Sequence, residues 1–149
     1  MLLPAFVACE KTEGFTPLTD VRPAIPVTVA NAIDYRPNPT VRASKADGKI
    51  QITLQIPATS GRTIKEITRV AAGTAYSIVQ TSTGLYNTAP IPGSGTSVMF
   101  NTTLTEYTTR AAGTIPASNA ELAKRFYFML TLDNDQVIYP SEVRVLVLD

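Results

Sequence analysis

Histidine and tryptophan are absent from this chain of 149 residues, and cysteine occurs only once. Without histidine, the chain can form no Ser-His-Asp triad, no Cys-His dyad and no imidazole metal site. Without tryptophan, it lacks the side chain best suited to stacking on sugars and cations. One cysteine cannot form an internal disulfide. We therefore expect a non-enzymatic protein with no metal and no cofactor.

Net charge is also nearly absent, because 13 basic side chains face 12 acidic ones and leave a formal charge of +1. Nucleic-acid-binding domains usually carry a clustered basic face, and proteins that bind anionic lipid carry a polybasic patch. The sequence has neither, so we expect no nucleic-acid partner. Its length and its 44% hydrophobic content suffice for one domain with its own core.

An apolar run fills the first eight positions, MLLPAFVA, and ends at Cys9. Secretory signals end in an apolar region followed by small residues. The tetrapeptide Phe6-Val7-Ala8-Cys9 resembles a bacterial lipobox, in which the cysteine is acylated and becomes the mature N-terminus. The resemblance implies that residues 1–9 end a lipoprotein signal and that Cys9 is lipidated. Because the run is short and no basic residue precedes it, we expect the full leader to begin before Met1.

A charged stretch, Glu10–Gly14, follows the cysteine and is similar to the segment after the cysteine in surface lipoproteins of the Bacteroidota. Residues 10–26 also contain three prolines and no apolar periodicity, the composition of an extended spacer. This order predicts a membrane-anchored protein, with a tether over 10–26 and a domain over 27–149. The alternative is that Leu2–Val7 is a buried strand and Cys9 a core residue, although Pro4 would confine such a strand to a sheet edge.

Alternating apolar and polar residues predict a half-buried strand over Lys49–Ile56. A second strand is predicted over Phe126–Leu132, followed by a turn and a return strand that breaks at Pro140 and resumes over Val143–Leu148. Val143, Val145 and Val147 are expected to face the core together with Phe126, Phe128, Leu130 and Leu132.

Weaker patterns favour strands over Val27–Ala32, Tyr76–Gln80 and Ser97–Leu104. The segment Thr63–Val70 repeats its apolar residues every third position, which we interpret as a strand with a bulge. One short helical turn is predicted near 118–125, because Ser118 and Glu121 have the spacing of a capping box.

Several short strands separated by turn residues predict an all-β protein, a single antiparallel two-sheet sandwich. The pattern resembles immunoglobulin-like and fibronectin-type-III-like domains. The segments IKEITRVAAG and FYFMLTLDNDQVIYPSEVRVLVLD are also similar to immunoglobulin-like domains of small Bacteroidota lipoproteins. That resemblance implies a place in the cell envelope, on the outer membrane, and carries no functional motif.

Two candidate contact regions remain. Tyr86 lies in the polar loop 81–96 and is the tyrosine we expect to be most exposed, as a possible ligand contact. The outward positions of the terminal strands are apolar too, which predicts either a covering segment, such as the N-terminal spacer, or a partner surface. These outward residues are Tyr127, Met129, Leu146 and Leu148.

The sequence thus predicts a binding or structural module that presents loops or an edge strand to a glycan or a protein partner. Two alternatives stay open. Scattered carboxylates could form the acid pair of a small hydrolase, or the apolar sheet face could serve an assembly or inhibitor protein.

Overall fold

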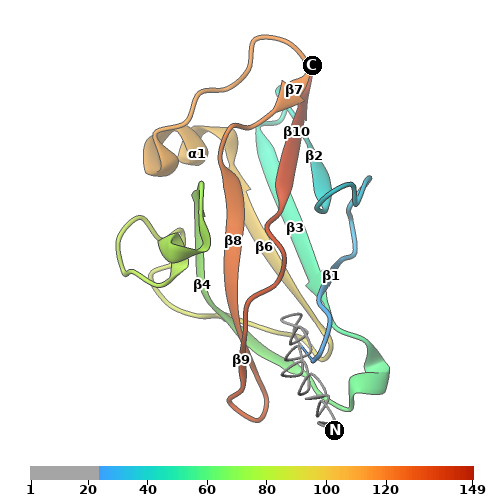
Figure 1. Ribbon diagram of the computed structural model, residues 1–149. Coiled ribbons are helices and arrows are strands. Elements are labelled where there is room, and N and C mark those ends of the chain that lie inside the picture. The colour runs from blue at the N-terminus through green and yellow to red at the C-terminus, as the bar shows by residue number, and fades with distance from the viewer. Residues whose placement is uncertain (1–23) are drawn as a thin grey trace, which may run out of the picture.

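The computed structural model describes residues 24–149, so the predicted signal segment and most of the predicted tether lie outside the described residues. The described chain forms ten strands, one α-helix and two 3-10 turns (Figure 1). In chain order these are β1 (Thr28–Val29), β2 (Thr40–Ser44), β3 (Lys49–Gln55), η1 (Ala58–Ser60), β4 (Ile64–Gly73), η2 (Tyr76–Val79), β5 (Ile91–Pro92), β6 (Ser97–Thr103), α1 (Leu104–Ala111), β7 (Ala120–Glu121), β8 (Arg125–Leu132), β9 (Val137–Ile138) and β10 (Arg144–Leu148).

Two layers of strands enclose the core, which confirms the all-β sandwich. One layer has the strand order β1-β3-β6, and the other combines β5-β4-β8-β9 with β2-β10-β7. An isolated bridge between Phe126 and Val143 joins these last two sheets. Figure 1 shows β3 and β6 crossing behind β8 and β10. Aromatic rings meet between the layers, where Phe100 of β6 lies 5.7 Å from Phe128 of β8.

The strongest sequence patterns form the expected strands. In β3 every second residue is buried, which places Ile50, Ile52 and Leu54 inside. The last strand is broken at Pro140 as predicted, and its inward valines are fully buried. The predicted bulge is also present, because the register of β4 against β8 shifts after Ile64 and again after Ile67.

The break at Pro140 lets one stretch of chain serve two partners. β9 pairs with β8, whereas β10 runs between β7 and β2. The β10–β2 pair is the one parallel pair among the described strands, with Val145 opposite Val41. The first long strand of the domain is therefore held directly against the last.

Three local predictions are wrong. Residues 118–125 form no helical turn: Ala120 and Glu121 are extended in β7 and pair with β10. Residues 76–79 form the 3-10 turn η2 instead of a strand. The strand predicted over 27–32 is limited to β1, Thr28–Val29.

The helix instead begins at Leu104, directly after β6. The side chain of Thr103 accepts a hydrogen bond from the Glu106 backbone N–H at 3.0 Å, and Leu104, Tyr107 and Ala111 face the core. Thr103 and Glu106 have the same spacing that Ser118 and Glu121 have in the sequence. The two capping signals are locally equivalent. The helix forms at the first one because α1 packs against the core, and the second one is extended because β7 pairs with β10.

The cap on α1 gives a direct test of this assignment. Replacing Thr103 by alanine removes the acceptor for the Glu106 N–H and should lower the free energy of unfolding by about 1 kcal/mol. The control is Thr105→Ala in the first turn, where the side chain is exposed and caps nothing. Urea denaturation should show a loss for Thr103→Ala and none for Thr105→Ala; equal midpoints for the two variants would contradict the capping role.

Candidate binding edge

Tyr86 is buried, so the expectation that it is the most exposed tyrosine is wrong. Its side chain is 8% exposed, and its ring centroid lies 5.4 Å from that of Phe126 and 5.8 Å from that of Phe100. Burial raises the pKa of its hydroxyl, which has no hydrogen-bond partner in the described part of the chain. The polar composition of the loop misled the prediction because this one ring turns back into the core.

Tyr127 is also buried, with 1% of its surface exposed, so it forms no part of an open partner surface. The cover is η2: the Tyr76 ring lies 4.8 Å from that of Tyr127, and Ala71 and Val79 complete a small second cluster. Burial and the neighbouring Glu142 raise the pKa of Tyr127 to about 12. Among the two predicted alternatives, a covering segment is present at this position, supplied by η2.

The remaining predicted site residues are Met129, Leu146, Leu148 and Cys9. Met129, Leu146 and Leu148 are each partly exposed. Leu148 lies at the rim of a polar hollow described below. Cys9 lies outside the described residues.

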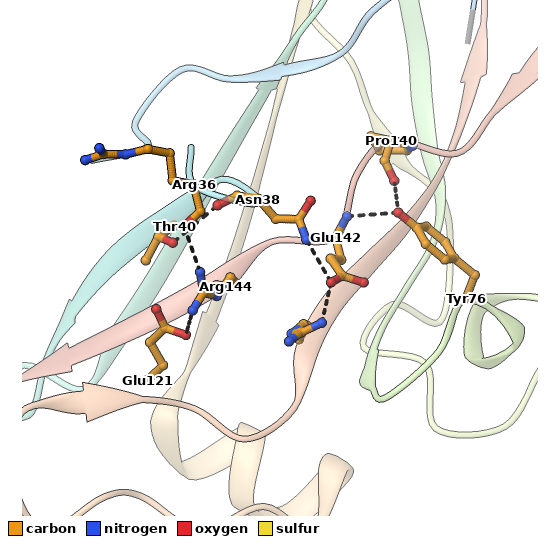
Figure 2. Close-up of polar contacts among 9 residues, drawn as sticks. Arg36, Asn38, Thr40, Tyr76, Glu121, Pro140, Glu142 and Arg144 are labelled. Carbon is orange, nitrogen blue, oxygen red and sulfur yellow. Dashed lines mark hydrogen bonds and ion pairs between the residues drawn. The ribbon is translucent and has the colours of Figure 1, made fainter. Parts of the chain in front are cut away.

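Charged side chains gather at the break between β9 and β10 (Figure 2). The Glu142 carboxylate accepts hydrogen bonds from Asn38 Nδ2 at 2.9 Å and from Arg125. The Tyr76 hydroxyl accepts from the Glu142 backbone N–H and donates to the Pro140 carbonyl, both at 3.1 Å. These contacts fasten η2, β8 and the loop before β2 to the broken strand.

Arg144 extends the same cluster along β10. It forms an ion pair with Glu121 and donates to the Arg36 carbonyl at 3.2 Å. Both carboxylates of the cluster, those of Glu121 and Glu142, are thus paired with arginines, and the cluster links β7, β8 and the broken strand to the loop before β2.

A polar hollow of about 990 Å³ opens where β2, β3, β6 and the start of α1 meet. Its lining includes Arg42, Asp47, Lys49, Gln51, Asn101, Glu106 and Asp149. Glu106 accepts from the Thr102 hydroxyl at 2.7 Å and pairs with Arg110, and these two contacts hold its pKa below the usual value. Asp149 pairs with Lys45 at 2.5 Å. The general acid of a glycoside hydrolase needs a raised pKa, and Glu106 has a lowered one.

The edges of the sheets are also candidate binding sites, because an unpaired backbone edge is a ready template for another strand. Side chains close the edge formed by β1 and β3. The Tyr35 hydroxyl bonds both the N–H and the carbonyl of Val29, at 3.1 and 2.5 Å. Asn31 donates to the Gln51 carbonyl at 2.8 Å and accepts from the Thr53 N–H at 3.0 Å. Both side chains thus take the place of a neighbouring strand.

The outer edge of β4 is closed in a similar way. β5 pairs with part of it, and the Tyr86 N–H donates to the Val70 carbonyl at 2.8 Å. Asn87 accepts from the Val70 N–H and donates to the Thr68 carbonyl, both at 3.0 Å. The side-chain amide again supplies one donor and one acceptor.

The outer edge of β2 is almost fully used as well. Residues 33–34 exchange backbone hydrogen bonds with Thr40, and Gly48 donates to the Ser44 carbonyl. Between them only Arg42 faces outward, and its exposed charge discourages the approach of a further strand.

In the part of the chain that the structure describes, the outer edge of β6 is open. The Leu104 N–H donates to the Gly48 carbonyl at 2.8 Å, which fixes the alternation of the β3–β6 ladder. The backbone groups of Met99 and Asn101 therefore point away from β3, and within residues 24–149 they have no hydrogen-bond partner. Met99 is 47% exposed, and Asn101 is exposed too.

The outward side chains of β6 carry no charge. Ser97, Met99, Asn101 and Thr103 are all neutral, and none is a proline. Natural proteins commonly protect an edge with a charged residue, a proline or a very short strand. β6 uses none of these devices over seven residues, and we identify it as the candidate binding edge.

β9 also has an outer side, at Val137 and Tyr139, which are each 41% exposed. This strand has only two residues, lies beside a tight turn and ends near Pro140. Such a short edge offers too few groups to align a partner strand.

Two further findings concern the described residues. None of their helices combines the length and apolarity needed to cross a membrane. Their acidic side chains do not gather in threes at any point where a metal ion could be held.

Side-chain closure of an edge can be tested at Asn87. Asn87→Ala leaves the Val70 N–H and the Thr68 carbonyl without these partners and should cost about 1–3 kcal/mol of stability. Hydrogen exchange at the Val70 amide should become faster. Asn87→Asp keeps the acceptor oxygen, so the Val70 amide should stay protected in that variant; equal exchange rates at Val70 in all three proteins would argue against closure by this side chain.

No known family model, curated protein or solved structure matches the chain.

Proposed function

We propose that the domain is a non-enzymatic binding module that receives an extended segment of a protein partner along the open edge of β6. The observation that carries this proposal is the contrast among edges. Side chains, short strands or a charge occupy the long edges at β1–β3, β4 and β2. Within residues 24–149, by contrast, Met99 and Asn101 leave four backbone groups unpaired on β6.

A protein backbone fits this edge better than a glycan does. Donors and acceptors alternate along β6 at the spacing of a strand, and another extended chain presents the matching series. Main-chain hydrogen bonds then supply affinity with little demand on partner sequence. A sugar has hydroxyls without this regular spacing, and the edge offers no exposed aromatic ring among its outward residues.

The second part of the proposal is the anchor. The lipobox-like Phe6-Val7-Ala8-Cys9, the charged stretch after it and the proline-containing spacer support a lipoprotein of the cell envelope, on the outer membrane, with Cys9 as the acylated residue. A tether of this kind keeps the domain near the membrane while the β6 edge stays free to meet a partner.

Strand addition at β6 can be tested with a synthetic peptide of the sequence of β3, KIQITLQ, which already pairs with the opposite side of β6. Adding it to the isotope-labelled protein should shift the NMR signals of the Met99 and Asn101 amides and slow their hydrogen exchange. The control peptide carries an N-methyl group on every internal residue, so that neither of its edges can donate a backbone hydrogen bond. Identical responses to both peptides, or none at either amide at a protein concentration where the two amides exchange fast on their own, would overturn the proposed function.

The anchor can be tested by mass spectrometry of the protein isolated from its native host. We expect an N-terminal Cys9 that carries acyl chains, and a Cys9→Ser variant that no longer partitions with membranes. An unmodified Cys9 still preceded by Val7 and Ala8 would rule out lipidation.

A further inference from the structure

The open edge of β6 is complementary to itself. Met99 and Asn101 each offer one N–H and one carbonyl, separated by one inward residue, Phe100. Two such edges that meet in antiparallel orientation satisfy each other's donors and acceptors in full. We propose that the segment received by β6 is β6 of a second copy of this chain, an inference that rests on the proposed function.

The available groups fix the register of this pairing. At one end of β6, Ser97 is closed by reciprocal hydrogen bonds with Ser94, at 2.8 and 3.1 Å. At the other end, Thr103 caps α1. Only a register that sets Met99 of one copy opposite Asn101 of the other uses the open groups of both residues, with Phe100 on the two-fold axis.

Charge does not oppose this arrangement. The outward side chains of β6 are neutral, and the charged residue nearest to them in the ladder is Lys49 of β3, opposite Thr103. Like charges that face each other across a strand pair would weaken it. Here the two edges bring together methionine, asparagine and their own backbone.

The other edges limit the assembly to two copies. Pairing at β6 turns the three-stranded sheet into a continuous one with the order β1-β3-β6-β6-β3-β1. Each end of that sheet is already closed by Tyr35 and Asn31. The interface is therefore isologous and produces a closed dimer, because no edge of this sheet is left to continue a filament.

Sedimentation velocity over a wide range of protein concentration measures the dimer directly. The wild-type domain should shift from monomer to dimer as its concentration rises. Asn101→Pro removes one outward N–H from each copy but leaves the β3–β6 ladder intact, and it should raise the dimer Kd at least about tenfold. Met99→Lys should have a comparable effect by placing a charge on the edge.

The matched control is Gln55→Lys, which introduces the same charge on the exposed face of β3, opposite Ser97 and one strand away from the edge. It should dimerise like the wild type. Circular dichroism of each variant checks that the sandwich is folded. Hydrogen exchange adds a second readout, because the Met99 and Asn101 amides should become protected as the dimer forms.

A wild-type protein that remains monomeric, with fast exchange at Met99 and Asn101 at every concentration, would overturn the homodimer. If the KIQITLQ peptide still protects those amides, the edge binds strands from other proteins and the proposed function stands. If the peptide also has no effect, both proposals fail. A dimer that Asn101→Pro and Met99→Lys leave unchanged would place the interface elsewhere and would equally overturn the inference.

Discussion

Backbone hydrogen bonding at strand edges is the constraint on which this structure depends. A two-sheet sandwich does not close on itself, so the outermost strands carry N–H and carbonyl groups that no neighbouring strand satisfies. This chain meets the requirement mostly with side chains: Asn31, Asn87 and the Tyr35 hydroxyl each bond a backbone donor and a backbone acceptor. The other long edges among the described residues are closed by side chains, short strands or a charge, and the edge of β6 is not.

The sandwich itself could be predicted from sequence because period-two alternation is a local signal. β3, β8 and the broken final strand carry it clearly, and the irregular spacing around Ile64 and Ile67 indicated a bulge that the structure contains. The helix was predicted in the wrong place for a physical reason. Ser118 and Glu121 have the capping spacing, as do Thr103 and Glu106, and only packing of α1 against the core distinguishes the two positions.

The candidate site could not be located in this way. Whether a backbone group is free depends on residues distant in sequence, such as Asn31 opposite Gln51 or Asn87 opposite Thr68. The polar composition of its loop predicted that Tyr86 is exposed. Its ring instead packs against those of Phe100 and Phe126. An edge strand was predicted as one means of binding, but no local pattern could say that it would be β6.

The parallel pairing of β2 with β10 has a mechanical consequence. A chain held at its N-terminal side transmits any pull through β1 and β2, and the five residues of β2 lie in register with those of β10. A force along these strands loads the hydrogen bonds of the ladder together in shear, instead of opening them one after another as a hairpin peels apart. β2, the strand that receives the load after the two residues of β1, is thus bonded to the last strand of the fold, and this ladder resists extension of the domain from its two ends.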